Sequence, residues 1–109
     1  MNMTEHYVQN EPSRTEVDAM QRPLLLEFGT AWCGHCRAAQ PLLAKALAER
    51  SGICHLKIED GPGRPLGRSF RVKLWPTLIL LENGQELARV VRPLNEQAIE
   101  QALGETGKG

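Results

Sequence analysis

The sequence predicts an α/β domain in which helices flank a central mixed β-sheet. An apolar run at residues 24–28 precedes a segment whose apolar positions recur at helical spacing, and a second strand pattern follows at residues 53–58. A strand, a helix and a second strand in this order form a βαβ unit, whose two strands are parallel. Further on, Asn83 and Gly84 lie between two apolar runs and predict a hairpin turn, which joins antiparallel strands. Together these patterns predict a sheet with both kinds of strand pairing.

The length and charge of the chain narrow the classes of protein it can belong to. It has 109 residues, the size of one domain that buries its own core. Its 13 basic and 13 acidic residues cancel, which gives no electrostatic reason to expect binding to nucleic acid or to an acidic membrane. Three cysteines are too few for a disulfide-stapled secreted scaffold, and the sequence has neither a secretory signal pattern nor an apolar run of membrane-spanning length. We therefore expect a cytoplasmic monomer that acts on protein or small-thiol partners and carries no cofactor.

The N-terminal elements begin with a polar stretch. Residues 1–11 are expected to be poorly ordered, with residues 6–8 as a candidate short edge strand. Ser13 and Glu16 then have the spacing of a capping box, which predicts the start of a helix that continues to about Gln21.

The remaining elements complete one folded domain, residues 12–103. After Cys33 and Cys36, the apolar pattern predicts a helix that runs to about Arg50. Pro41 lies inside this helix and should kink it. Asn95 is expected to cap the last helix, and residues 104–109 are expected to fray. Between these helices the sequence predicts a strand at 53–58, a loop rich in glycine and proline at 60–67, a helical turn at 66–70, and strands at 78–81 and 87–91.

Two cysteines, Cys33 and Cys36, lie where the first strand meets its helix. The unpaired N–H groups and the dipole at a helix N-terminus stabilise a thiolate, so Cys33 is the expected nucleophile. Cys36 follows one helical turn later, close enough to attack a mixed disulfide on Cys33, and is the expected resolving thiol. Such a pair also begins many zinc sites, but a tetrahedral site needs four ligands, and Cys54, His55 and His6 lack a matching spacing. No metal site is therefore expected.

Glu27 is an acid within an otherwise apolar strand. If this strand is central in the sheet, its carboxyl group is desolvated and can exchange a proton near neutral pH. If the strand lies at an edge, Glu27 simply points to solvent. The apolar residues on both sides of Glu27 favour the central position.

The order of these elements and their motifs resembles the thioredoxin family over residues 24–103. The specific features are the sequence Trp-Cys-Gly-His-Cys at residues 32–36, Pro41 five residues after the second cysteine, Pro76 and Thr77 at the start of an apolar strand, and Asn83 with Gly84 in the hairpin. The Gly-His pair between the cysteines is similar to that of protein disulfide isomerases, whereas bacterial thioredoxins usually carry Gly-Pro.

The resemblance implies a thioredoxin fold with a redox-active dithiol exposed at the end of the first strand. It implies that Pro76 is a cis-proline facing the dithiol, and that the backbone of Trp75 pairs with a bound polypeptide as an added strand. It also implies that Glu27, six residues before Cys33, matches the family's buried acid and accepts the proton of Cys36 when that thiol attacks the mixed disulfide. The residues expected to contact substrate are Trp32, Gly34, Trp75, Pro76 and Arg92.

Two histidines near the dithiol each have two interpretations. As an imidazolium facing Cys33, His35 would stabilise the thiolate and make the protein more oxidising than a thioredoxin with Gly-Pro; as an exposed side chain, it would have no such effect. His55 lies near the position where many thioredoxins carry a lysine that faces the buried acid. It either pairs with Glu27 or is a plain packed or edge histidine, which is the simpler interpretation. Cys54 is expected to be a small core residue.

Three positions depart from the family pattern. Gly29 stands where an aromatic residue is usual, Trp75 stands where Ile, Val or Thr usually precedes the cis-proline, and Arg92 lies near a groove that glycine often lines. We hypothesise that the Trp75 indole either fills the space that Gly29 leaves open or partly covers the substrate groove. These departures concern the choice of partners more than the chemistry.

The sequence therefore predicts a thiol–disulfide oxidoreductase that reduces protein disulfides through Cys33 and Cys36 and serves cell redox homeostasis. Its expected partners are disulfide-containing proteins and a reductase or small thiol that regenerates the dithiol. Two alternatives are a disulfide isomerase or oxidase with the same chemistry, and a non-catalytic binding or holdase module with the same fold. The presence of Cys33, Cys36, Glu27 and Pro76 together argues against the second alternative.

Overall fold

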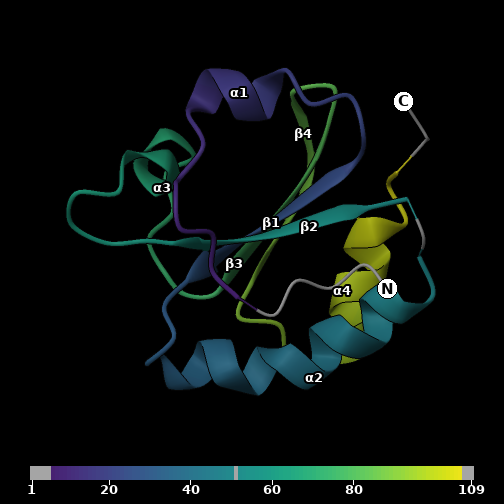
Figure 1. Ribbon diagram of the computed structural model, residues 1–109. Helices are drawn as coiled ribbons and strands as arrows, with labels where there is room; N and C mark the ends of the chain where they lie inside the picture. Colours follow the sequence, from purple (N-terminus) through teal and green to yellow (C-terminus); the bar gives the residue numbers. More distant parts are fainter. Residues whose placement is uncertain (1–5, 51, 107–109) are drawn as a thin grey trace.

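The computed structural model describes residues 6–50 and 52–106, which form a four-stranded sheet in the order β2-β1-β3-β4 (Figure 1). β1 (Leu24–Gly29) pairs in parallel with β2 (Cys54–Glu59) and antiparallel with β3 (Thr77–Glu82), which in turn pairs antiparallel with β4 (Gln85–Val91). The helices are α1 (Arg14–Asp18), α2 (Gly34–Ala48), α3 (Pro65–Ser69) and α4 (Glu96–Leu103). β1 is thus an inner strand of a mixed sheet, as the sequence predicts.

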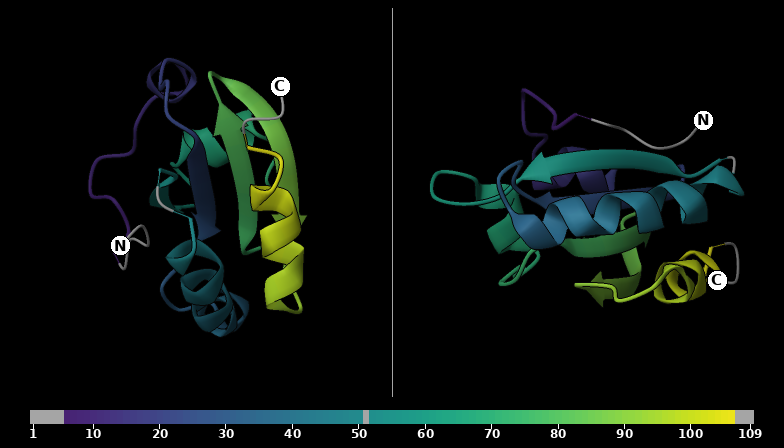
Figure 2. Two further views of the ribbon diagram at one scale, coloured as in Figure 1. Left: turned by 90° about the vertical axis from the view of Figure 1, so that its right-hand side faces the viewer. Right: turned by 90° about the horizontal axis from the view of Figure 1, so that it is seen from below.

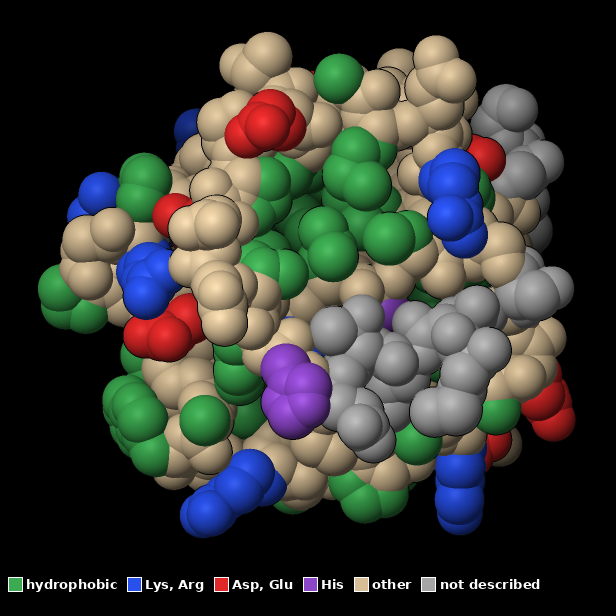
Figure 3. Space-filling model, viewed as in Figure 1, with side chains coloured by type: hydrophobic (Ala, Val, Ile, Leu, Met, Phe, Trp, Pro, Cys, Tyr) green, Lys and Arg blue, Asp and Glu red, His purple; other side chains and the backbone are tan. Residues whose placement is uncertain are grey.

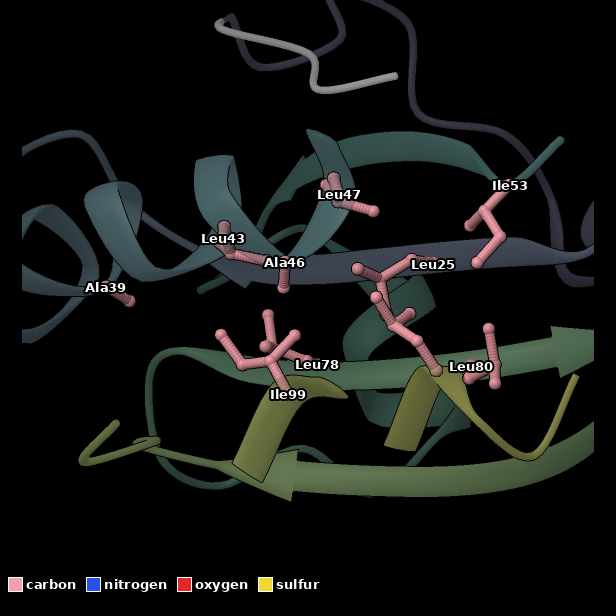
Figure 4. Packing of buried hydrophobic residues seen from close by; sticks show 10 residues of the cluster. Leu25, Ala39, Leu43, Ala46, Leu47, Ile53, Leu78, Leu80 and Ile99 are labelled. Carbon is pink, nitrogen blue, oxygen red and sulfur yellow. The ribbon is translucent and has the colours of Figure 1, made fainter. Parts of the chain in front are cut away.

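Helices cover both faces of the sheet, with α1 and α3 on one side and α2 and α4 on the other (Figures 1 and 2). Successive residues of a strand point to opposite faces. Leu25 therefore packs with Leu43 of α2 and Ile99 of α4 (Figure 4), whereas Leu24 and Leu26 pack on the side of α1 and α3. Burial on both faces explains why β1 is apolar without alternation.

The boundaries of α1 follow from its caps. The Ser13 hydroxyl accepts a hydrogen bond from the N–H of Glu16, and the Glu16 carboxylate accepts one from the N–H of Ser13, which completes the predicted capping box. The helix ends at Asp18 rather than near residue 21. Beyond Asp18 the N–H of Met20 donates to the carbonyl oxygen of Val17, a tighter i→i−3 bond that closes the last turn before the chain runs on to β1.

The N-terminal segment lies along the outer edge of β2. Tyr7 forms an isolated parallel bridge with Lys57, and the N–H of Val8 donates to the carbonyl oxygen of Lys57 at 2.9 Å. The candidate edge strand at residues 6–8 is therefore a single bridge. Of residues 1–11, which were expected to be poorly ordered, residues 1–5 lie outside the described residues, and within the rest Tyr7 and Val8 bond to β2.

The last helix is capped by a side chain at its start and by a backbone hydrogen bond at its end. Asn95 accepts a hydrogen bond from the N–H of Ala98 and caps α4 as predicted. Beyond the helix, a hydrogen-bonded turn continues to Thr106. The rest of the tail expected to fray, residues 107–109, lies outside the described residues.

On the face seen in Figure 3, hydrophobic side chains gather in a shallow hollow below α1. This side of the sheet is covered by the two short helices α1 and α3, and partly buried residues such as Met20 and Val72 pack against the core there. Among the described residues, no helix is both long and apolar enough to cross a membrane.

Candidate active site

The two cysteines lie at the junction of β1 and α2. Cys33 is the N-cap residue of α2, and its Sγ accepts a hydrogen bond from the backbone N–H of Cys36 at 3.4 Å. Both side chains are free thiols, with Cys33 8 % exposed and Cys36 1 % exposed. The start of the helix therefore leaves a small part of Cys33 open to solvent and buries Cys36 almost completely.

The surroundings of the two sulfurs shift their pKa values in opposite directions. Burial raises the pKa of Cys33, but hydrogen bonds with Cys36 and the backbone of His35, together with the positive charge of Arg92, outweigh it and lower the pKa below its usual value. Burial raises the pKa of Cys36 to about 12, and its hydrogen bond to Cys33 and the negative charges of Cys33 and Glu27 act in the same direction. Cys33 is the thiol that ionises first, and Cys36 stays protonated.

Glu27 is 0 % exposed, which excludes the edge-strand alternative. Its Oε1 lies 2.9 Å from Nε2 of His55, and its Oε2 accepts a 2.8 Å hydrogen bond from Nε2 of Gln40. The simpler interpretation of His55 as a plain packed histidine is therefore wrong. The parallel register sets His55 opposite Leu25, two positions from Glu27 on the same face of the sheet, so the two side chains meet.

Gln40 and Lys57 also belong to this site, although neither was identified from the sequence. Besides its bond to Glu27, the Gln40 amide donates to the backbone carbonyl of Cys36 at 2.8 Å and accepts from Nζ of Lys57 at 3.1 Å. Lys57 is 6 % exposed, and its ammonium lies 4.7 Å from the centroid of the Tyr7 ring. One signal was present: Gln40 follows Cys36 by four residues and so lies one turn along the same face of the helix.

The space beside Gly29 is occupied by side chains other than Trp75. A Cβ added at Gly29 would collide with Sγ of Cys36, and the Tyr7 hydroxyl lies 3.4 Å from the same point. The hypothesis that Trp75 fills this space is therefore wrong. Position 29 has no room for an aromatic side chain because the resolving sulfur and the N-terminal segment already fill it.

A cavity of about 220 Å³ opens beside the resolving sulfur. Its lining includes Tyr7, Cys36, Gln40 and Lys57. It also includes Thr30, whose buried hydroxyl has no hydrogen-bond partner within the described part of the chain. Burial raises the pKa of the Tyr7 phenol, which therefore stays neutral. A polar cavity thus reaches the rear of the dithiol.

Trp75 lies on the other side of the dithiol, in the loop before β3. The Trp75–Pro76 peptide bond is cis. The indole N–H of Trp75 donates to the Asp60 carboxylate at 2.8 Å, and its ring meets the Trp32 ring edge-on, with 5.6 Å between centroids. Trp32 is 73 % exposed and directly precedes Cys33. The paired indoles therefore form part of the surface beside Cys33, and partial covering of a substrate groove by Trp75 stays a prediction.

Arg92 is held against the same loop. Its backbone N–H donates to the carbonyl oxygen of Pro76 at 3.0 Å, and its side-chain Nε donates to the carbonyl oxygen of Trp75 at 2.8 Å. Its φ of 49° is a left-handed conformation that non-glycine residues rarely adopt. Gly34, at the start of α2, has nothing within 4 Å of the position of an added Cβ, so it borders open space.

The remaining candidate residues lie outside these hydrogen-bonded groups. His35 is exposed, and its ring has no hydrogen-bond or ion-pair partner among residues 6–50 and 52–106. A hydrogen bond of its backbone lowers the pKa of Cys33, and tuning by the ring stays a prediction. Cys54, at the start of β2, is partly buried against the core on the side of α1 and α3. Within the described part of the chain, no group of three or more His, Cys, Asp or Glu side chains is arranged to hold a metal ion.

Comparisons relate the chain to known proteins. A family model described as Thioredoxin matches residues 5–105. Thioredoxin from Mycobacterium bovis is 31 % identical over 94 residues, which cover 84 % of this chain and 79 % of that protein. The bifunctional thioredoxin reductase/thioredoxin of Mycobacterium leprae is 29 % identical over 85 residues, 77 % of this chain and 19 % of that protein. The structure of thioredoxin 2 from Pseudomonas aeruginosa PAO1 in its reduced form is similar with a TM-score of 0.86 and 53 % identity, covering 98 % of this chain and 100 % of that one.

Proposed function

Because this chain belongs to the thioredoxin family and is a thiol–disulfide oxidoreductase of the protein-disulfide reductase type, we propose that Cys33 is its nucleophile and Cys36 its resolving thiol. The observation that carries this assignment is the placement of the two sulfurs at one helix N-terminus, with Cys33 as the N-cap residue accepting the N–H of Cys36 and with Cys36 the more deeply buried; their pKa values shift in opposite directions accordingly. The more acidic thiol supplies the thiolate for the first attack. The less acidic thiol stays protonated until the mixed disulfide has formed.

The proposed reaction transfers two electrons from the dithiol to a substrate disulfide in two exchanges. The Cys33 thiolate attacks one substrate sulfur, the substrate S–S bond breaks, and the other substrate sulfur leaves as a thiolate that takes up a proton. Cys36 then gives its proton to a base, attacks the Cys33 sulfur and displaces the second substrate sulfur, which is also protonated. The substrate leaves as two thiols, and the protein leaves with a Cys33–Cys36 disulfide.

Glu27 is the proposed base for Cys36. Gln40 supports this role because its amide bonds both to the Glu27 carboxylate and to the backbone carbonyl of Cys36. His55 holds the other carboxylate oxygen, so the acid is fixed from two sides. The cavity between Cys36 and Lys57 would let the proton leave toward solvent. We also propose that the ring of His35, when protonated, favours the Cys33 thiolate.

Substrate is proposed to bind across the exposed surface around Cys33. The Trp32 ring offers apolar contact, and open space at Gly34 leaves the start of α2 accessible. The backbone of Trp75 and Pro76 is the proposed docking edge, with Arg92 beside it. A substrate segment that pairs there through main-chain groups would be accepted with little regard to its sequence.

We further propose that the chain works as a monomer in the cytoplasm and that a reductase or small thiol restores the dithiol. The M. leprae relative combines a thioredoxin reductase and a thioredoxin in its name, which supports an enzymatic electron donor. In a reducing compartment the net reaction is reduction of substrate disulfides. In an oxidising one the same exchange would run as oxidation or isomerisation, because the potential of the surroundings sets the direction.

Reduction of insulin disulfides, with dithiothreitol as electron donor, tests the assignment of the cysteines. The Cys33→Ser variant should fall to the background rate. The Cys36→Ser variant should still attack but accumulate a mixed disulfide on Cys33, visible by mass spectrometry. Cys54→Ser is the matched control and should keep full activity, since Cys54 is outside the pair. Full activity of Cys33→Ser, or a mixed disulfide on Cys36 of the native protein, would contradict the proposal.

A further inference from the structure

The carbonyl oxygen that precedes the cis-proline has a partner within the protein itself. Nε of Arg92 donates to the carbonyl oxygen of Trp75 at 2.8 Å. The backbone N–H of Arg92 donates to the next carbonyl oxygen, that of Pro76, at 3.0 Å. A substrate N–H that pairs with the Trp75 carbonyl therefore competes with the guanidinium for that oxygen.

The guanidinium also lies within electrostatic range of the attacking sulfur. The Trp75 ring contacts the ring of Trp32, the residue next to Cys33. The positive charge of Arg92 is one of the causes that lower the pKa of Cys33. Because the Arg92 side chain is exposed, a substrate bound at Cys33 can reach it.

A displaced guanidinium has one strongly favoured kind of new partner. Its five N–H donors form a planar fork that matches a carboxylate, often through two parallel hydrogen bonds. Asp60, whose carboxylate reaches this loop, accepts a hydrogen bond from the Trp75 indole instead. A carboxylate on the substrate would satisfy the displaced guanidinium of Arg92, whereas a lysine in the same place would be repelled.

We propose that Arg92 makes the protein selective for disulfides flanked by an acidic residue in the substrate polypeptide. This inference rests on the proposed function of the dithiol. In the free protein Arg92 closes the Trp75 carbonyl, and an acidic substrate draws the guanidinium away and opens that oxygen for main-chain pairing. A neutral or basic segment must compete with the guanidinium without compensation, and so reacts more slowly.

The test uses three disulfide-linked peptides that differ only in the residue after the reactive cysteine, which is Asp, Asn or Lys. Second-order rate constants for their reduction by the reduced protein are measured at low and high salt. We expect the Asp peptide to react about fivefold faster than the Asn peptide, near the upper limit for an exposed ion pair. The Lys peptide should be slowest, and the differences should shrink at high salt.

Variants at position 92 then test whether Arg92 causes the preference for the Asp peptide. Arg92→Gln should remove the preference for Asp, and Arg92→Lys should keep part of it because the charge remains. Arg22→Gln is the matched control, since Arg22 lies before the opposite end of β1, and it should keep the full preference. Thermal unfolding checks each variant, and if Arg92→Gln does not fold, the Arg92→Lys variant still tests the role of the fork.

A binding measurement separates this inference from the proposed function. Thioether analogues of the three peptides, which cannot exchange, are titrated against the reduced protein with tryptophan fluorescence as the signal. We expect the affinities to fall in the same order as the rate constants, with the Asp analogue binding most tightly and the Lys analogue most weakly. If the protein reduces the three peptides equally fast and binds their analogues equally tightly, Arg92 does not have the proposed role, and the reductase activity stands. A preference for Asp that survives Arg92→Gln has the same meaning. Discrimination by Arg92 in binding, with no reduction that depends on Cys33, supports the role of Arg92 and contradicts the proposed function alone.

Discussion

The two sides of the dithiol differ in how they meet solvent. Behind Cys36 lies a buried side, in which polar groups of β1, α2 and β2 are hydrogen-bonded to one another. In front of Cys33 lies a rim of exposed or half-buried side chains around the loop before β3. Proton transfer needs groups that are fixed and shielded from water, whereas recognition needs groups that a substrate can reach. The buried side consists of Glu27, Gln40, His55 and Lys57, and the rim consists of Trp32, Trp75 and Arg92.

This division predicts that the buried side controls the second exchange and the rim controls the first. Glu27→Gln should slow the attack of Cys36 on the mixed disulfide about 1000-fold at pH 7, within the range of a positioned general base. The first attack by Cys33 should keep its rate, because that sulfur ionises without Glu27. Stopped-flow single turnovers with a peptide disulfide resolve the two exchanges. An equal loss in both would remove Glu27 from its proposed role.

Gln40 should have a smaller effect on the same step. Gln40→Leu should slow the second exchange about fivefold, the effect of one hydrogen bond worth about 1 kcal/mol, since it frees the Glu27 carboxylate from α2. It should also lower the free energy of unfolding by about 2 kcal/mol, because buried groups of Glu27 and Lys57 lose a partner. Gln97→Leu, at an exposed position of α4, is the control. A loss of stability with an unchanged second exchange would make Gln40 purely structural.

The pH dependence of alkylation should distinguish Cys33, which lies beside the rim, from Cys36, which lies against the buried side. The rate rises with pH as a thiol loses its proton, and the lowered pKa of Cys33 sets its midpoint below that of an ordinary thiol. Cys36, with its pKa raised to about 12, should stay unmodified through the neutral range. Arg92→Gln removes a nearby positive charge and should raise the Cys33 midpoint, and the proposed effect of the His35 ring predicts the same direction for His35→Ala. Iodoacetamide labelling mapped by mass spectrometry follows both cysteines. Labelling of Cys36 at a lower pH than Cys33 would reverse the assignment of nucleophile and resolving thiol.

The smallest effect is expected from the backbone conformation of Arg92, through the free energy of unfolding. Arg92→Gly should raise the free energy of unfolding by about 0.5 to 1 kcal/mol, because glycine adopts the φ of 49° without the steric cost that a side chain brings. Arg71→Gly is the matched control, since Arg71 has a similar φ of 59°. Chemical denaturation measures both. Stabilisation by Arg71→Gly together with destabilisation by Arg92→Gly would mean that the bond from Arg92 to Trp75 outweighs the strain.

Most of the fold could be predicted because its signals are local. The apolar run of β1, broken only by Glu27, the capping box at Ser13 and the Asn83-Gly84 turn each act over a few residues, and each element lies where its signal predicts. The predicted length of α1 was wrong, because helix periodicity does not show where the chain must turn toward β1. The positions of Cys33 and Cys36 at a helix start followed from the same local patterns.

The candidate site could be predicted only where a residue contradicts its surroundings. Glu27 was identifiable as an acid in an apolar strand, and its burial is confirmed. Gln40 and Lys57 were not identified, because a polar residue on a helix or strand is ordinarily exposed. Lys57 is buried and lies against the Tyr7 ring, which comes from a distant part of the chain, and Gln40 is half-buried beside it. The contact of Trp75 with Asp60 likewise depends on how two loops meet, which no local spacing encodes.

The glycine at position 29 limits how this active site can be redesigned. An added Cβ would require the volume that the Cys36 sulfur occupies, so any larger residue must push that sulfur from its place. Across the dithiol, Trp75 has room for a large ring because it lies partly at the surface, against Trp32. A mutational library that varies the two positions together therefore has an asymmetric choice of side chains: residue 75 accepts bulk, and residue 29 accepts none until the sulfur at position 36 has been replaced by something smaller.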